Sequence, residues 1–111
     1  MKKIVELSLF ILFTVTTFAQ KGTAYNDRVL ESKILKQTTH YSIYLPQGYE
    51  TSTLDYPVLY LLHGGGDKWK DWLLKGQAVT IADKTIASGE APEMIIVMPD
   101  GMQNWYNNNI D

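Results

Sequence analysis

Apolar and polar positions along the chain change their period several times, and each change predicts an element. Between Thr39 and Leu45 the two kinds alternate, so that Tyr41, Ile43 and Leu45 share one face. The other face carries His40, Ser42 and Tyr44. A period of two predicts a half-buried strand, and Pro46 ends it because proline cannot donate to a sheet ladder.

The residues before this strand predict a partner for it. Val29–Lys36 is apolar at its ends and charged between them, which indicates a second strand. Gln37-Thr38 would then connect the two strands as an antiparallel hairpin. Gln20–Asp27 is polar and is expected to be a loose lead-in, and Gln47–Asp55, rich in Thr, Ser and Gly, a turn region.

Two later segments are apolar without interruption. Val58–Leu62 and Ile95–Met98 have no polar face, which is typical of strands in a parallel sheet covered by helices. Between them Ala78–Ser88 places apolar residues at helical spacing, and Gly89 is expected to end that helix. Strand, helix and strand make a βαβ unit with a right-handed crossover. The predicted class is α/β, with an N-terminal antiparallel hairpin and one βαβ unit.

The N-terminus predicts an export signal. Lys2 and Lys3 precede the uncharged stretch Leu7–Phe18, and Ala19 completes a small-residue cleavage site before Gln20. These are the three parts of a secretory signal peptide over residues 1–19. A membrane anchor is the alternative, but a span needs about 20 apolar residues. We therefore expect residues 20–111 to be secreted or periplasmic, without a stable membrane span.

The amino-acid composition argues against several classes of function. At 45% hydrophobic and 20% charged, the 111 residues suit a single globular domain. The formal net charge of -2 gives no electrostatic argument for nucleic acid as a partner. The absence of cysteine excludes disulfides, thiolate metal sites and a cysteine nucleophile.

The strongest chemical signal is His63-Gly64-Gly65-Gly66, directly after an apolar strand. Three glycines without Cβ atoms allow a sharp turn that presents bare backbone N–H groups. In the α/β-hydrolase architecture such a loop supplies one donor of the oxyanion hole. The alternative is a simple tight turn, but the flanking strand and helix favour the oxyanion interpretation. A phosphate loop is excluded because no Gly-Lys-Ser/Thr follows.

Four other polar residues are candidates for chemistry. His63 has only His40 as a possible partner histidine, so we expect it to fix the loop by hydrogen bonding rather than to bind metal. Asp67 and Asp71 lie four residues apart, a spacing that places them on one helix face if a helix includes both. Without a third ligand we interpret them as capping carboxylates and expect no metal.

Aromatic residues gather in the segments that follow the two apolar strands. They are Trp69, Trp72, Trp105 and Tyr106. Ligands of α/β folds bind at the carboxyl ends of strands, so these rings either line a substrate cleft or pack under the loops. The sequence leaves both alternatives open.

Three ordered segments carry a family resemblance. YSIYLPQGYE, YPVLYLLHGGGDKWKDW and IIVMPDG together resemble the esterase family of secreted α/β-hydrolases. That family includes feruloyl and acetyl-xylan esterases of carbohydrate esterase family one, the esterase D-like enzymes and the mycolyltransferases. The resemblance implies a serine carboxylic-ester hydrolase that acts on feruloyl or acetyl esters of polysaccharide and needs no cofactor.

The resemblance also implies roles for individual residues. The backbone N–H of Gly65 would be the oxyanion donor, with Gly64 and Gly66 shaping its loop. The turn at Asp100 and Gly101 would border the cleft. Substrate would be contacted by three aromatic residues, Trp72, Trp105 and Tyr106.

One part of the family pattern is absent. The 111 residues contain no G-x-S-x-G, and none of the serines lies between glycines at that spacing. In this fold serine, acid and histidine follow the second apolar strand in that order, so all three would lie beyond Asp111. We therefore expect residues 20–111 to be a partial domain without the nucleophile elbow and triad, inactive alone, whose partner is the missing C-terminal half.

The family's strand order, 1-2-4-3-5, adds a physical expectation. It places Val58–Leu62 between Ile95–Met98 and the nucleophile strand, so here that segment would be an exposed, aggregation-prone edge. Two alternatives remain: an exported, non-catalytic carbohydrate-binding module that uses Trp69, Trp72 and Trp105, or a non-functional truncated product.

Overall fold

The computed structural model describes residues 19, 21–102 and 106. The predicted signal peptide lies almost entirely outside these residues, and so does Trp105. In chain order the elements are β1 (Thr23–Ser32), β2 (Gln37–Leu45), the 3₁₀ helix η1 (Tyr49–Thr51), β3 (Val58–Tyr60), α1 (Asp71–Leu74), α2 (Ala78–Ala87) and β4 (Ile95–Pro99).

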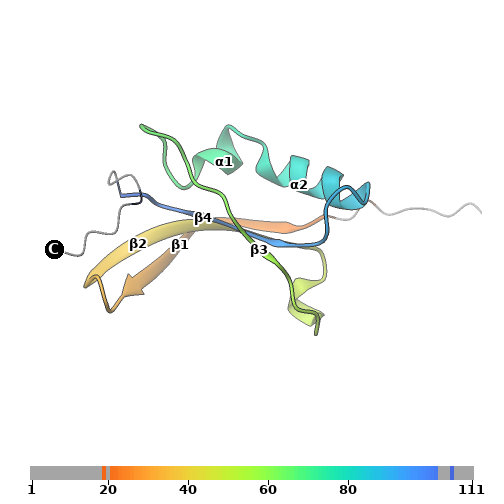
Figure 1. Cartoon of the computed structure of the whole chain (residues 1–111), viewed down its shortest axis with the longest axis horizontal. Helices are drawn as coiled ribbons and strands as arrows, with labels where there is room; N and C mark the ends of the chain where they lie inside the picture. Colours follow the sequence, from red (N-terminus) through yellow and green to blue (C-terminus); the bar gives the residue numbers. More distant parts are fainter. Residues whose placement is uncertain (1–18, 20, 103–105, 107–111) are drawn as a thin grey trace, which may run out of the picture.

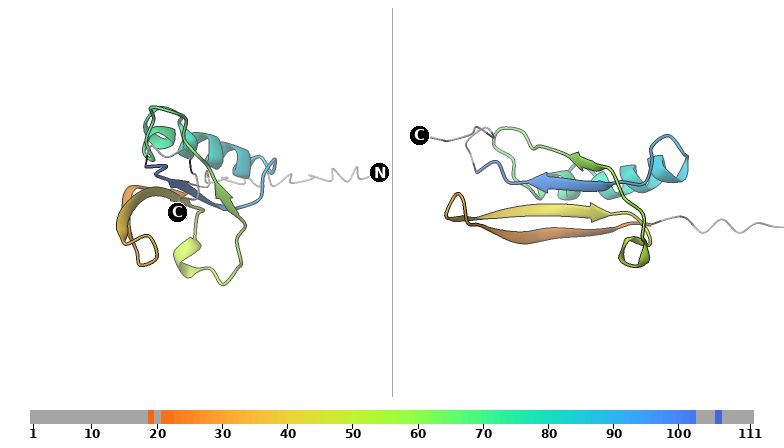
Figure 2. Two further views of the ribbon diagram at one scale, coloured as in Figure 1. Left: turned by 60° about the vertical axis from the view of Figure 1, so that its left-hand side comes forward. Right: turned by 60° about the horizontal axis from the view of Figure 1, so that its bottom comes forward.

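The strands form one mixed sheet in the order β1-β2-β4-β3 (Figure 1). β1 pairs with β2, and β2 with β4, in antiparallel fashion, whereas β3 and β4 are parallel. Figure 2 shows the arrows of β3 and β4 pointing the same way, with α2 alongside them. The predicted α/β architecture, a hairpin followed by a βαβ unit, is therefore confirmed.

The bounds of the hairpin differ from the sequence prediction. β1 begins at Thr23, opposite Leu45, and ends at Ser32, opposite Gln37. The expected loose lead-in is thus wrong from Thr23 onward, and the chain reverses over residues 33–36 rather than at Gln37-Thr38. The reason is that β2 offers backbone partners along its whole length, and the polar side chains of an edge strand can remain in water.

The buried face of β2 is also not the expected one. Ser42 and Tyr44 are almost fully buried, whereas on the apolar face only Leu45 is buried and Tyr41 and Ile43 are half-buried. Tyr44 reaches the helix layer, where its hydroxyl donates to Asp83 of α2 at 2.8 Å. Figure 1 shows both α-helices on one side of the sheet, so that side, and not the more apolar one, is covered.

The core lies between α2 and the centre of the sheet. It contains Tyr44, Ala78, Ala82, Ile96 and Met98. The small alanines let the helix approach strands β2 and β4 closely, since a side chain that ends at Cβ keeps the two backbones near each other.

α2 ends as the sequence predicts. Ser88 is its last half-helical residue, and Gly89 follows with φ 78°. The N–H of Gly89 donates to Ile86 O and that of Glu90 to Thr85 O, both at 3.1 Å. These two bonds form a Schellman motif, which needs a residue that adopts a left-handed backbone at low cost.

β3 is shorter and far more exposed than an interior strand. It covers Val58–Tyr60, and the exposed fractions of its side chains run from 44% to 66%. The parallel pairing extends one residue further, because Leu61 N–H donates to Val97 O at 2.9 Å. β3 is therefore the exposed edge that the strand order predicts. Within the described ranges, the helices are too short to cross a membrane.

Candidate active site

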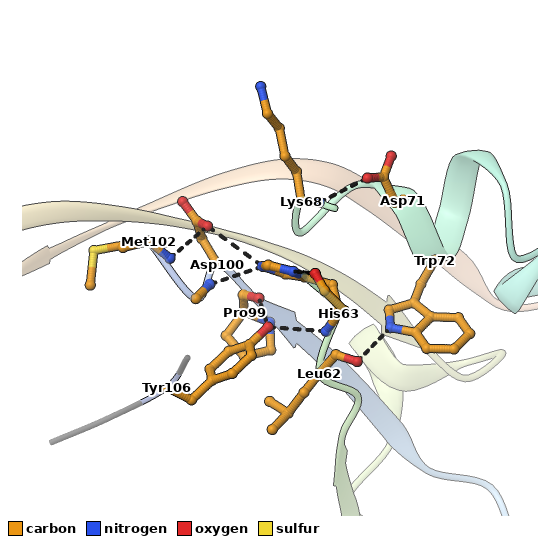
Figure 3. Close-up of polar contacts among 11 residues, drawn as sticks. Leu62, His63, Lys68, Asp71, Trp72, Pro99, Asp100, Met102 and Tyr106 are labelled. Carbon is orange, nitrogen blue, oxygen red and sulfur yellow. Dashed lines mark hydrogen bonds and ion pairs between the residues drawn. The ribbon is translucent and has the colours of Figure 1, made fainter. Parts of the chain in front are cut away.

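The carboxyl ends of β3 and β4 lie side by side and open into a cleft of about 600 Å³. Figure 3 shows polar groups from both ends meeting around the His63 side chain. The cleft is lined by His63, Gly64, Gly65, Gly66, Asp67, Lys68, Trp69, Asp100, Gly101, Met102 and Tyr106. Parallel strands place the segments that follow them at the same edge of the sheet, and ligands of α/β folds bind there.

The imidazole of His63 joins the two segments that follow the strands. Its Nδ1 lies 2.9 Å from Gly64 O, and its Nε2 lies 3.0 Å from the N–H of Gly101. Nε2 must accept the bond from Gly101, so the proton of the neutral ring belongs on Nδ1, which donates to the carbonyl. The side chain is only 9% exposed. His63 therefore uses both ring nitrogens within the protein, one on each side of the cleft.

Tyr106 makes a second connection between the same two strands. Its hydroxyl accepts the N–H of His63 at 3.0 Å and donates to Pro99 O at 3.3 Å (Figure 3). Burial raises the pKa of this hydroxyl. A Cβ on Gly101 would lie 3.0 Å from the Tyr106 ring, so the glycine allows the ring to sit against the turn.

The glycine segment forms a tight turn at the edge of the cleft. The N–H of Asp67 donates to Gly64 O at 3.2 Å, and Gly66, with φ 83°, occupies the position that requires a left-handed backbone. Within the part of the chain that the structure describes, the N–H groups of Gly65 and Gly66 donate to no protein group. Both residues are exposed at the cleft. The turn is thus able to bind an anionic oxygen.

Asp100 places a carboxylate on the other side of the cleft. One of its oxygens accepts the N–H of Met102 at 3.0 Å and lies 3.7 Å from Nε2 of His63. Its own N–H donates to His40 O at 2.9 Å, which ties the turn to β2. Asp100 and Gly101 therefore line the side of the cleft that faces the glycine turn.

The aromatic residues are divided between two environments. The indole N–H of Trp72 donates to Leu62 O at 2.9 Å (Figure 3). Its ring packs against the core cluster. It lines a separate cavity of about 190 Å³ rather than the larger cleft. Trp69 and Tyr106 line the cleft itself.

The two spaced aspartates do not share a helix. Asp67 precedes α1, and only Asp71 belongs to it, so the condition for one common helix face is not met. Asp71 accepts the N–H of Lys68 at 2.8 Å, and this bond is the main reason for its lowered pKa. Both carboxylates lie within 3.4 Å of Nζ of Lys75, whose pKa they raise. Among the described residues, no group of three potential ligands is placed to hold a metal.

A polar cluster that sequence reasoning missed lies beside the cleft. Asp27 binds His40 at 2.8 Å and Lys70 at 3.0 Å, and the His40 ring stacks on Trp69. No local signal reveals this cluster, because Asp27 and Lys70 are 43 positions apart and meet only through a bulge in the hairpin.

A comparison with known protein families shows the family of this chain. The family model "Putative esterase" matches residues 32–111, which is well over half of the chain. The chain belongs to this esterase family. The matched range contains the glycine turn, the cleft and all strands except most of β1.

Proteins similar to this chain are named as feruloyl or ferulic acid esterases. It is 40% identical over 67 residues to an endo-1,4-beta-xylanase/feruloyl esterase of Xylanibacter ruminicola, which covers 57% of this chain and 9% of that protein. A solved ferulic acid esterase aligns with TM-score 0.68 and 37% identity over 74% of this chain and 31% of that one.

A second solved relative was determined with a ligand. It is a CE1 ferulic acid esterase of Anaeromyces mucronatus in complex with ferulic acid, with TM-score 0.61 and 33% identity over 72% of this chain and 29% of that one. This chain thus spans less than a third of the length of each of these three relatives.

Proposed function

We propose that this chain forms the oxyanion side of a serine carboxylic-ester hydrolase that acts on feruloyl or acetyl esters of polysaccharide. The backbone N–H of Gly65 donates to the oxygen that becomes negative during acyl transfer, while Gly64 and Gly66 shape the turn. The acyl-ester substrate occupies the cleft between this turn and Asp100, against Tyr106. The proposal includes no metal and no cofactor.

One observation carries the proposal. In the glycine turn after β3, the backbone N–H groups of Gly65 and Gly66 have no protein acceptor in the described structure, and both residues line the cleft. Free backbone donors that are already in place stabilise a developing oxyanion without reorganisation, which is why each is worth about 10²–10³-fold in rate. The family match and the ferulic acid esterase relatives support the same chemistry.

We further propose that these 111 residues alone do not turn over ester. They contain no G-x-S-x-G, and the members of a serine triad act as a unit, so loss of the nucleophile removes most of the rate. Purified chain incubated with 4-nitrophenyl acetate or methyl ferulate is expected to match the buffer rate. Saturable hydrolysis above buffer would contradict this part of the proposal.

A chimaera tests the oxyanion role directly. Residues 23–102 replace the aligned portion of the solved ferulic acid esterase, and hydrolysis of methyl ferulate is measured. We expect an active enzyme, in which Gly65→Pro, by removing the N–H, lowers kcat by about 10²–10³-fold. Thr53→Pro is the matched control, since this exposed loop residue is remote from the cleft lining and follows Ser52, whose ψ of 144° suits a proline.

Two results would contradict the oxyanion role. One is a folded chimaera that hydrolyses no ester, and the other is a Gly65→Pro variant as active as the Thr53→Pro control.

We also propose that the chain is exported after cleavage between Ala19 and Gln20. Expression in a bacterium with the native N-terminus should give a mature protein whose first residue is Gln20. N-terminal sequencing that finds Met1 in the secreted or periplasmic fraction would contradict this proposal.

The alternative of a carbohydrate-binding module has less support. It relies on Trp69, Trp72 and Trp105 as an exposed platform, but Trp72 packs against the core with its indole N–H bonded to Leu62. Trp105 lies outside the described residues. We therefore favour the esterase.

A further inference from the structure

Trp69 forms part of the cleft wall and is held in place from the hairpin. It lies between the glycine turn and α1 and lines the cleft together with the three glycines. Its ring stacks on that of His40, with ring centroids 4.7 Å apart and an angle of 23° between the planes. Lys70 Nζ lies 5.3 Å from the centre of the indole ring. The half-buried indole thus rests on β2 and borders the space in front of the glycine turn.

A single carboxylate fixes the groups around this indole. Asp27 Oδ1 lies 2.8 Å from His40 Nδ1, and Asp27 Oδ2 lies 3.0 Å from Lys70 Nζ. Both contacts favour the ionised acid, so the bond to His40 and then the bond to Lys70 lower the pKa of Asp27. Asp27 reaches both partners because it lies in the bulge between Tyr25 and Arg28 of β1, where the pairing register shifts.

His40 also connects this cluster to the opposite side of the cleft. Its carbonyl accepts the N–H of Asp100 at 2.9 Å, while its ring supports Trp69. One residue of β2 therefore positions both the indole and the turn that contains Asp100. The ring makes the first contact and the backbone carbonyl makes the second.

We propose that Trp69 is a stacking subsite for the flat ring of an aromatic acyl group, and that Asp27, His40 and Lys70 are positioning residues that hold the indole. This inference rests on the proposed esterase function and deepens it. An indole offers a large rigid face, and stacked aromatic pairs gain about 0.5–1.5 kcal/mol beyond the area that they bury. An acetyl group has no ring face, so the subsite distinguishes an aromatic acyl ester from an acetyl ester.

Binding to the full chain tests the subsite without any need for turnover. Ferulate, acetate and xylobiose are titrated separately into ¹⁵N-labelled protein while the Trp69 indole signal is followed. Ferulate should shift this signal, and acetate and xylobiose should not. Trp69→Ala should weaken ferulate binding about threefold to tenfold, the factor that corresponds to the stacking energy. Tyr60→Ala is the control, since Tyr60 is an exposed aromatic residue of β3 that does not line the cleft, and its Kd should be unchanged.

Two conservative variants separate stacking from space filling. Trp69→Phe keeps a ring and should retain at least half of the wild-type affinity, whereas Trp69→Leu keeps apolar volume without a ring and should behave like Trp69→Ala. His40→Phe retains a stacked ring but loses the bond to Asp27. This variant should change the Trp69 indole signal in the free protein and weaken ferulate binding about twofold to threefold, a loss on the scale of a modest change in hydrogen bonding.

Several outcomes would overturn the inference. They are an unshifted indole signal at millimolar ferulate, equal affinity of the Phe and Leu variants, an unchanged Kd in Trp69→Ala, or Trp69-dependent binding of xylobiose in place of ferulate. Each is distinct from failure of the oxyanion role, which is measured as kcat in the chimaera with Gly65→Pro. An active chimaera, together with ferulate binding that does not depend on Trp69, would support the esterase function and contradict the subsite.

Discussion

Tyr44 is the residue at which three separate parts of the chain meet. Its hydroxyl and the N–H of Gly22 both donate to the same Oδ1 of Asp83, each at 2.8 Å. The ring is 2% exposed, and burial is the main cause of its raised pKa, so the hydroxyl remains a donor to the carboxylate. The segment before β1 is therefore attached to α2 through one side chain of β2.

This contact makes the space at Gly22 critical. A Cβ built on Gly22 would overlap the Tyr44 ring, so Gly22→Ala forces the ring or the N-terminal segment to move. We expect a loss of about 1–3 kcal/mol in the free energy of unfolding, as for other overpacked sites. Urea denaturation measures it. The neighbouring exposed change Lys21→Ala is the control and should stay within about 0.5 kcal/mol. Equal stability of the two variants would show that the ring is not confined.

Two carboxyl groups with lowered pKa values should make the stability of the fold depend on pH in the acid range. The bond from His40 lowers the pKa of Asp27, and the backbone N–H of Lys68 lowers that of Asp71. A lowered pKa means that the ionised form stabilises the folded state above the unfolded pKa of about 3.9, and that this contribution is lost as the pH falls through the folded value.

Thermal unfolding should therefore show Tm falling below about pH 4. The double variant Asp27→Asn/Asp71→Asn should lose part of that dependence and be less stable at pH 7. Asp55→Asn, a change at an exposed loop residue, is the control. An identical pH profile in the double variant and the wild type would contradict the assignment.

At the level of elements, the sequence correctly predicts those features that depend on interactions between neighbouring residues. The extent of α2, its end at Gly89 and the strand β4 agree with the sequence because spacing and a left-handed glycine determine them. The bounds of β1 and the buried face of β2 do not agree, because pairing and the helix that covers the sheet determine these.

In the candidate site, too, the sequence predicts the turns that follow the strands but not the contacts between distant segments. The glycine turn and the neighbouring Asp100 turn follow two strands whose parallel pairing the sequence indicates, so their proximity was expected. The Asp27 cluster was not predictable, since it depends on a bulge and on contacts across 43 positions. Trp72 and Trp69 look alike in sequence, and only packing separates the one on the core from the one at the cleft.

The start of α2 has a strained backbone that a substitution can relieve. Gln77, just before the helix, has φ 53° and ψ 34°, a left-handed conformation that costs a residue with a Cβ about 1–2 kcal/mol. Gln77→Gly should therefore raise the free energy of unfolding by up to about 1 kcal/mol, once the greater entropy of the unfolded glycine is counted. Gln47→Gly, at an exposed loop position without positive φ, should instead be neutral or destabilising. Urea denaturation of both variants compares them, and a destabilised Gln77→Gly would contradict the expectation.

At the scale of the whole molecule, the sheet has one long polar edge and one short apolar edge. β1 exposes mostly polar side chains, whereas β3 exposes Val58, Leu59 and Tyr60 beside backbone groups that are unpaired within the described residues. An apolar strand edge is a template for pairing with another chain. Self-association at this edge is the expected behaviour of the isolated chain.

A charge on this edge should reduce the self-association. Leu59 is 44% exposed, and Leu59→Lys adds a cation to the open strand. We expect a lower weight-average mass in sedimentation equilibrium and less light scattering at a given concentration. Ile81→Lys is the matched control, because it removes an exposed apolar residue of α2, 58% exposed, and adds the same charge away from the edge. An equal effect of the two variants would attribute association to general hydrophobicity rather than to the strand.

The strand order also bears on the sequence of events at the ribosome. β3 pairs only with β4 in the described sheet, and β4 also pairs with β2, so residues 95–99 complete both ladders. A nascent chain can close the β1–β2 hairpin early, but the glycine turn has no supporting neighbour until translation has passed Pro99 and the exit tunnel has released it. Assembly of the cleft is thus coupled to the emergence of β4, and until then two open ladders are accessible to the chaperones that the nascent chain meets.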